Sequence, residues 1–273
     1  MWASSVLPDR LEPRRRGPRN FVIREFDRYL RKVLAGQKLA PGWNLLEIGA
    51  GNSAWLSYFA TEHGASVTGL DYSSAGCQKL QRILKRDGVD GKVIHADAFA
   101  PPPGAVGSFD VVVSFGVAEH FQDTRGALSA FKTFVKPGGL LLTFVPNMAG
   151  VLGKTQRLLN KPVYDIHVPL DATALASAHE RAGLTVEACD YLVFLNFGVL
   201  NLNGLPPNTA TFAAKRALLA LARRAAFVCA AVEERTHALP LTRTAASYVV
   251  AVARRSTEAP HDSVVMAGRP PKT

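Results

Sequence analysis

Short apolar runs alternate with amphipathic segments along the middle of the chain. Runs of a few residues rich in Val, Leu and Ile, bounded by polar or glycine-containing segments, are typical of buried strands. They cover residues 43–48, 65–70, 92–95, 109–114 and 140–145. The intervening segments 54–62, 74–86 and 124–135 predict helices. This βαβα order predicts an α/β fold with a doubly wound, mostly parallel sheet covered by helices on both faces.

The flanking segments have a different pattern. Residues 20–34 carry apolar side chains at helical spacing and predict an amphipathic helix after a loose arm over 1–19. Farther on, 171–182 predicts a helix, 184–193 and 247–253 predict strands, and 211–232 predicts an apolar, basic helix between those strands. We therefore expect an N-terminal arm and lid helix at 1–40, a main domain at 41–255 with a helical insertion at about 200–240, and a disordered tail at 256–273.

The formal net charge of +10 is concentrated at the two ends. Residues 1–40 carry ten Lys and Arg against four Asp and Glu, and residues 210–255 carry eight against two. A basic flank can attract phosphate or an anionic surface, although solvated helix faces have the same composition. Polar and charged residues interrupt the apolar stretches 191–214 and 210–232, so neither predicts a membrane span.

Three cysteines lie far apart in the chain and fit neither a zinc-binding spacing nor a disulfide framework. The first residues lack the charged start and apolar run of a secretory signal. Both observations indicate a cytoplasmic protein.

The first apolar run leads into a glycine-containing turn, Glu47-Ile48-Gly49-Ala50-Gly51, which precedes a predicted helix. Glycine allows a sharp turn and a close approach of ligand to backbone. Asp71 follows the second predicted strand, 22 residues after Gly49, where a carboxylate can accept hydrogen bonds from a ribose diol. The pair indicates an adenosine-type ligand, but the same spacing also fits a dinucleotide fingerprint.

Three more segments separate these alternatives. His95-Ala96-Asp97-Ala98-Phe99 places a second acid after the third strand, where it suits an adenine amine. Ser114-Phe115-Gly116-Val117-Ala118-Glu119-His120-Phe121 follows the fourth strand, and Lys136-Pro137-Gly138-Gly139 precedes the fifth. The order of these motifs resembles that of class I methyltransferases dependent on S-adenosylmethionine (SAM), in the small-molecule branch without a separate target-recognition domain. The resemblance covers residues 43 to about 195 and, weakly, 245–255.

This resemblance implies a seven-stranded, Rossmann-like sheet with an antiparallel last strand. It also implies SAM as cofactor and S-adenosylhomocysteine as product. In such enzymes the glycine turn would lie under the methionine moiety, and the turn after the fourth strand would lie near the sulfonium. Asp71 would bind the ribose and Asp97 the adenine amine. The expected contacts are Glu47, Gly49, Ala50, Gly51, Asp71, Tyr72, Asp97, Ala98, Phe99, Ser114, Phe115 and Gly116.

Candidate catalytic residues are two histidines, His120 and His167. An imidazole can take a proton from an acceptor hydroxyl or amine, although His120 could instead have a structural role or contact SAM. The connection after the fifth strand carries Asn147, Tyr164 and His167, and in such folds it borders the substrate. We therefore expect these residues to contact the substrate. His167 could instead be an ordinary loop histidine near the start of the next helix. Phe21, with Phe26 and Tyr29, either covers the pocket or packs the N-terminal helix onto the sheet.

Methyl transfer from a sulfonium is an in-line displacement that mainly requires positioning and exclusion of water. We find no metal-ligand spacing and predict a metal-independent enzyme that methylates an O, N or S atom of a small molecule, with natural-product or secondary metabolism as its setting.

A nucleic-acid methyltransferase remains an alternative because of the basic flanks, but the Pro-Pro-aromatic tetrapeptide of base-amine enzymes is missing after the fourth strand. A nicotinamide-dependent oxidoreductase and a non-catalytic SAM-binding protein are further alternatives. Helix 211–232 could support a homodimer.

Overall fold

The computed structural model describes residues 7–17, 20–236 and 238–257. Of the predicted disordered tail, residues 258–273 lie outside the described residues, as do residues 1–6 of the predicted arm. The described residues form one seven-stranded sheet in the order β3-β2-β1-β4-β5-β7-β6. The strands are β1 (Asn44–Ile48), β2 (Ser66–Asp71), β3 (Lys92–His95), β4 (Phe109–Phe115), β5 (Val135–Pro146), β6 (Leu184–Phe194) and β7 (Ala246–Arg255).

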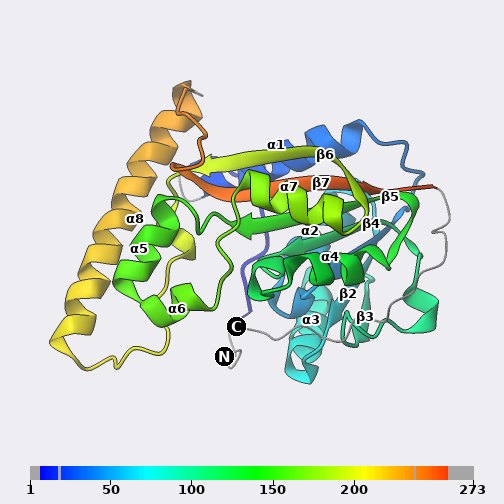
Figure 1. Ribbon diagram of the computed structural model, residues 1–273, viewed down its shortest axis with the longest axis horizontal. Helices are drawn as coiled ribbons and strands as arrows, with labels where there is room; N and C mark the ends of the chain where they lie inside the picture. The colour runs from blue at the N-terminus through cyan, green and yellow to red at the C-terminus, as the bar shows by residue number, and fades with distance from the viewer. Residues whose placement is uncertain (1–6, 18–19, 237, 258–273) are drawn as a thin grey trace.

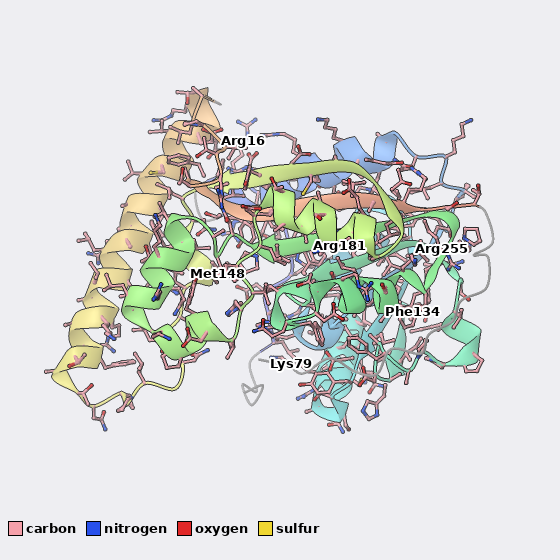
Figure 2. The ribbon with its side chains drawn as sticks, in the orientation of Figure 1. Arg16, Lys79, Phe134, Met148, Arg181 and Arg255 are labelled. Carbon is pink, nitrogen blue, oxygen red and sulfur yellow. The ribbon has the colours of Figure 1, made fainter. Side chains whose placement is uncertain are left out.

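The sheet is parallel from β3 to β5, and β7 pairs antiparallel with both β5 and β6. The predicted α/β class, seven strands and antiparallel last strand are therefore confirmed. β5 begins earlier than predicted because the segment Lys136-Pro137-Gly138-Gly139, expected as a turn, belongs to the strand. The register between β5 and β4 shifts in this part of the strand. The guanidinium of Arg255 donates a hydrogen bond of 2.6 Å to the carbonyl oxygen of Val135, which ties the end of β7 to the start of β5 (Figure 2).

Alternate residues of each central strand pack on opposite faces of the sheet. Leu45 and Val111 join a core with helices α1 (Phe21–Ala35), α2 (Trp55–His63) and α3 (Ser74–Asp87). Leu46 and Val112 join a second core with α4 (Thr124–Lys132) and α7 (Ala172–Arg181), which lie in front of the sheet in Figure 1. These four strand residues are 0% exposed, and burial of such a side chain contributes roughly 1.5–3 kcal/mol.

Side-chain caps fix where several helices begin. Ser73 accepts a hydrogen bond from the N–H of Gly76, Asp123 from that of Gly126, and Asp171 from that of Ala174. Such caps satisfy amide groups that lack partners in the first helical turn. The helices after β2 and β4 thus begin at fixed positions, close to the carboxyl edge of the sheet.

Three helices lie beyond the carboxyl edge of β5: α5 (Val151–Leu159), α6 (Lys161–Asp165) and α8 (Ala210–Thr236) (Figure 1). Neither α5 nor α6 was predicted, whereas α8 matches the predicted helix. A small apolar cluster joins α5 to α8 through Leu152, Leu159, Leu200 and Leu219.

Helix α8, which corresponds to the predicted apolar, basic helix 211–232, is only partly packed against the rest of the described protein. Leu219 and Ala230 are the buried residues among those described in α8, while Leu221 and Val228 are 63% and 65% exposed. Its apolar and basic residues are spread around the helix, so one face cannot bury them all. No helix in the described ranges combines the length and the continuous apolar character that crossing a bilayer requires.

The described part of the predicted loose arm is packed against the main domain. Pro13 is buried, and Arg86 donates a hydrogen bond of 2.5 Å to the carbonyl oxygen of Pro8. Arg14 forms an ion pair of 3.2 Å with Glu62 of α2. These contacts place the arm beside α2 and α3, and α1 continues from it across the sheet.

Candidate active site

Strand order and register gather the predicted cofactor residues along one edge of the sheet. Ile48 at the end of β1 is opposite Leu70 of β2 and Ser114 of β4, and Asp71 is opposite His95 of β3. The loops that follow these four strands therefore lie side by side. The sequence-predicted contacts from Glu47 to Gly116 belong to these strand ends and loops.

The glycine turn has little free space around it. Gly49 has φ +76°, and a Cβ there would lie 2.6 Å from Cγ2 of Val117. A Cβ on Gly51 would lie 2.6 Å from Oδ2 of Asp71 and 2.7 Å from Cα of Gly76. Only glycine allows the backbone to approach so closely.

Asp71 connects the two loops that begin the site. Its Oδ2 accepts a hydrogen bond of 2.8 Å from the N–H of Gly51, and its Oδ1 accepts one of 2.8 Å from the N–H of Ser73. The side chain is buried, whereas the next residue, Tyr72, is 52% exposed. Asp71 therefore fixes the position of the glycine turn relative to the start of α3.

Two buried polar groups lie at the strand ends of this region. One carboxylate oxygen of Glu47 and the hydroxyl of Ser114 lack hydrogen-bond partners among the described residues, and both side chains are at most 1% exposed. Burial raises the pKa of Glu47 to about 8. Buried polar atoms without partners are costly, so both groups mark a polar region at the strand ends.

The predicted adenine end is formed by the loop after β3. Oδ1 of Asp97 accepts a hydrogen bond of 3.1 Å from the N–H of Phe99, whose ring lies 5.2 Å from that of Phe121. Ala98 is buried in the core beside α4. Phe99 is half-buried.

A pocket of ≈ 600 Å³ adjoins the glycine turn and the end of β4. Among the predicted residues it includes Phe115, Gly116, His120 and His167. Its lining comes from α1, the glycine turn, α2, β4, β5, the helices beyond the sheet, and β7. The lining residues are Val22, Phe26, Asn52, Trp55, Phe115, Gly116, Glu119, His120, Phe144, Pro146, Met148, Gln156, Val163, His167, Val199, Asn201 and Tyr248.

One wall of the pocket is aromatic. Trp55 and Phe115 stack with ring centroids 4.8 Å apart, and Phe115 and Phe144 with centroids 4.6 Å apart. Phe26 stacks on Phe144 at 5.2 Å and meets Tyr248 edge-on at 4.9 Å. Apart from Phe26 and Phe115, sequence reasoning did not assign these aromatics to a site. Met148, between the end of β5 and α5, adds an apolar side chain to the same pocket (Figure 2).

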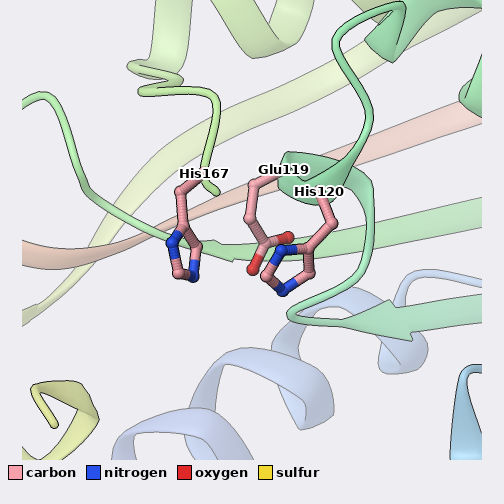
Figure 3. Close-up of side chains that lie close together, drawn as sticks. All are labelled: Glu119, His120 and His167. Carbon is pink, nitrogen blue, oxygen red and sulfur yellow. The ribbon is translucent and has the colours of Figure 1, made fainter. Parts of the chain in front are cut away.

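Three ionisable side chains converge on another part of the pocket: Glu119, His120 and His167 (Figure 3). The imidazole centroids of His120 and His167 are 4.6 Å apart. Glu119 is 2% exposed, and burial raises its pKa to about 8. Burial, with a smaller contribution from His120, lowers the pKa of His167. The two candidate catalytic histidines, far apart in sequence, thus meet at one place.

Each imidazole is oriented by a backbone carbonyl. Nδ1 of His167 lies 2.7 Å from the carbonyl oxygen of Val163, and Nδ1 of His120 lies 3.2 Å from that of Ile166. A carbonyl can only accept, so Nδ1 of His167 carries the hydrogen and its Nε2 holds the lone pair.

The other three predicted substrate residues do not line the pocket. Asn147 is 0% exposed, and its Nδ2 donates hydrogen bonds of 2.8 and 2.9 Å to the carbonyl oxygens of Arg243 and Ala246. Phe21 is buried in the core, so Val22 and Phe26 are the residues of α1 that reach the pocket. Tyr164 lies on α6 outside the lining. The placement of Asn147 indicates a structural role, since its amide anchors the loop before β7.

Comparison with known proteins agrees with this fold. A family model described as a methyltransferase domain matches residues 18–188. The chain is 30% identical over 167 residues to the ubiquinone biosynthesis O-methyltransferase of Pseudomonas aeruginosa strain LESB58, covering 58% of this chain and 68% of that protein.

Two solved structures have the same fold. A putative sarcosine dimethylglycine methyltransferase from Galdieria sulphuraria superposes with a TM-score of 0.57 at 14% identity, covering 85% of this chain and 86% of the other. A geranyl diphosphate C-methyltransferase from Streptomyces coelicolor A3(2), solved with S-adenosyl-L-homocysteine, superposes with a TM-score of 0.55 at 16% identity, covering 84% and 75%.

The chain belongs to the methyltransferase domain family and is a class I SAM-dependent methyltransferase. Its cofactor is SAM, as predicted, and the oxidoreductase alternative is thereby excluded.

Proposed function

We propose that this methyltransferase transfers the methyl group of SAM to a hydroxyl oxygen of a small metabolite that has an apolar, ring-containing body. The observation that supports this most directly is the composition of the pocket beside Gly116. It combines a stacked aromatic wall with two imidazoles in one cavity of ≈ 600 Å³. Such a cavity suits a small ligand with a flat apolar body and one reactive polar group.

The residues that would hold SAM lie at the ends of β1, β2, β3 and β4 and in the loops that follow these strands. Glu47 and the turn from Gly49 to Gly51 would bind the amino acid end, Asp71 and Tyr72 the ribose, and Asp97 to Phe99 the adenine. When bound, SAM supplies an electrophilic methyl group on a sulfonium. Phe115 and Gly116 border the acceptor pocket, and with the buried Ser114 before them they would separate this group from solvent.

The aromatic wall and the histidine pair would have different tasks. Trp55 and Phe115, which are half-buried, would pack against a ring and exclude water, with Phe144 buried behind them, and this would favour displacement at the methyl carbon. His120 and His167 lie where a hydroxyl of the stacked ring can reach them. The hydroxyl oxygen forms the bond to the methyl carbon, its proton passes to an imidazole nitrogen, and the sulfur retains the electron pair of the broken S–C bond.

The relationship with the P. aeruginosa enzyme supports oxygen as the accepting atom, since that protein is named as an O-methyltransferase. Ion pairs in the basic N-terminal flank support a small acceptor over RNA. Arg14 and Arg31 pair with Glu62, and Arg24 pairs with Glu234 at 2.8 Å. The paired carboxylates offset part of the basic charge of this flank, which reduces the charge available to a phosphate backbone.

The proposal can be tested with SAM that carries an isotopically labelled methyl group. Purified protein is incubated with a panel of phenols, catechols, aliphatic alcohols, amines, thiols and total RNA, and the labelled product is identified by mass spectrometry. Transfer to the oxygen of a phenol or related ring-bearing alcohol is expected. Transfer confined to RNA or to amines would contradict the proposal.

A variant pair then tests the aromatic wall. Trp55→Leu is expected to raise the acceptor KM by about 2- to 13-fold, since a stacking interaction contributes about 0.5–1.5 kcal/mol beyond burial. The SAM KM should change little. Leu221→Ala, on the exposed part of α8, is the matched control and should retain the wild-type acceptor KM. Equal changes in the two KM values for Trp55→Leu would argue against a wall specific to the acceptor.

A further inference from the structure

We infer that Glu119, His120 and His167 form a binding site for one divalent first-row transition-metal ion, with Zn²⁺ as the representative. This differs from the metal-independent enzyme predicted from the sequence, because the histidine that completes the set is 47 residues away from His120. The inference deepens the proposed function and rests on it for the role of the ion, but the binding itself can be measured without any reaction.

The three side chains offer a mixed set of donors in one place. One ligand atom from each residue lies within 4.8 Å of those from the other two (Figure 3). Donors about 2.1 Å from a shared tetrahedral ion are roughly 3.4 Å apart. Binding therefore requires the ligand atoms to approach one another by up to about 1.4 Å, a movement that side-chain rotation can supply.

Backbone groups already orient the histidine ligands. Nδ1 of His167 is bonded to the carbonyl oxygen of Val163, which leaves the lone pair on Nε2, and the carbonyl oxygen of Ile166 orients the ring of His120. Metal-binding histidines commonly donate their second ring N–H in this manner. The N–H of Val168 also donates a hydrogen bond of 2.7 Å to the carbonyl oxygen of Glu119, which links the segments that carry the ligands.

Glu119 provides an independent indication that a ligand belongs here. The side chain is 2% exposed, and its Oε2 has no hydrogen-bond partner in residues 7–17, 20–236 and 238–257. A buried carboxylate oxygen without a partner costs free energy that a cation would offset. In Figure 3 this carboxyl group points between the two imidazoles, where an ion bound by both would lie.

The donor types select the class of ion. Two imidazole nitrogens and one carboxylate suit Zn²⁺, Co²⁺ or Fe²⁺, whereas Mg²⁺ and Ca²⁺ prefer sites made of oxygen. All three side chains line the acceptor pocket, so a fourth coordination position can face the acceptor. A bound ion would lower the pKa of an acceptor hydroxyl placed at that position, and the proton would be released to solvent. The imidazoles would then serve as ligands, so direct proton transfer to an imidazole would apply only to the protein without the ion.

The test uses the full chain without an affinity tag, dialysed against a chelator and then titrated with Co²⁺ in the absence of SAM. We expect one equivalent to bind with the visible absorption of a four- or five-coordinate Co²⁺ site, and Zn²⁺, but not Mg²⁺, to displace it. Glu119→Gln, His120→Ala and His167→Ala should each weaken binding by at least about 10-fold. His95→Ala, which removes an exposed imidazole on β3, is the matched control and should bind as the wild type does.

Absence of a saturable equivalent in the wild type would overturn the inference, and so would wild-type affinity in the three ligand variants. Circular dichroism shows whether each variant is folded, and the wild-type titration does not depend on any substitution. If the protein methylates a phenol but binds no metal ion, the inferred metal site is wrong and the proposed function stands. If the protein binds the metal ion but methylates no hydroxyl acceptor, the inferred metal site stands and the proposed function is wrong.

Discussion

The backbone N–H of Val168 donates a hydrogen bond of 2.7 Å to the carbonyl oxygen of Glu119, joining the loop after α6 to the segment after β4. These residues are neighbours, in sequence, of His167 and His120. The bond therefore holds the two imidazoles at 4.6 Å from each other across a separation of 47 residues. The polar part of the acceptor pocket depends on this connection between segments.

Asp71 is expected to be essential for SAM binding. Asp71→Ala removes the acceptor of the Gly51 and Ser73 N–H groups, so the affinity for SAM should fall by about 10- to 100-fold, since hydrogen bonds to charged groups contribute about 1.5–3 kcal/mol. Calorimetric titration measures this loss. The exposed Asp90→Ala variant is the control for charge. SAM affinity at the wild-type level in Asp71→Ala would refute the role assigned to this carboxylate.

Gly51 should not tolerate even one methyl group. In Gly51→Ala the new Cβ would meet Oδ2 of Asp71 and Cα of Gly76, so the turn must shift. Such overpacking costs about 1–3 kcal/mol, and SAM affinity should decrease by about 10-fold or more. Gly104→Ala adds the same methyl group where nothing lies within 4 Å, and it should bind SAM normally. Similar affinities of the two variants would show that space at Gly51 is not limiting.

Asn147 is expected to matter for stability and not for the acceptor. Asn147→Ala leaves the carbonyl oxygens of Arg243 and Ala246 without their donor, at a cost of about 2 kcal/mol. This corresponds to a decrease in Tm of about 5 °C, measurable by thermal denaturation. The exposed Asn208→Ala is its control. An increased acceptor KM at unchanged Tm would instead support the substrate contact predicted from the sequence.

His179 should make the fold sensitive to acid. It is buried against β5, with Nδ1 donating to the carbonyl oxygen of Leu175 and Nε2 lying 3.0 Å from Oγ1 of Thr143. Burial lowers its pKa from 6.5 to about 4. Between these values only the unfolded chain binds the proton, so the stability supplied by neutral His179 is lost as pH falls from 6.5 towards 4. The total is about 3 kcal/mol, from about 1.4 kcal/mol for each unit of pKa.

Denaturant unfolding at pH 7.5 and pH 5 measures this effect. His179→Gln should lose less stability between the two pH values than the wild type, by about 2 kcal/mol, because half or more of the window lies above pH 5. An identical decrease in both proteins would assign the acid sensitivity to other groups.

Much of the fold could be predicted because the central strands are short apolar runs between glycine turns and capped helices. The helices α5 and α6 could not, because Gly153 interrupts the helical pattern of the first and the second is only five residues long. A Cβ on Gly153 would lie 1.8 Å from the carbonyl oxygen of Met148, so tertiary packing explains that glycine. Local patterns do not record such a contact.

For the site, the sequence located the loops after the strands but not their tertiary partners. His120 and His167 were candidates individually, whereas their proximity depends on hydrogen bonds between distant segments. The aromatic wall draws Phe26, Trp55, Phe115, Phe144 and Tyr248 from five different elements. No spacing in the sequence relates these residues, so only the packed structure could show the wall.

The position of β7 has a consequence for the order in which the sheet assembles. β7 follows every other strand in the chain, yet it lies between β5 and β6 and pairs with both. During synthesis β6 leaves the ribosome while its neighbour in the sheet is still missing, and the whole of α8 must follow before β7 appears. Strands β2, β3, β4 and β5 can each pair as soon as they emerge, because each has a neighbour in the sheet that precedes it in the chain. The edges of β5 and β6 therefore remain unpaired until late in translation, and this interval is when a nascent chain is most exposed to misassembly.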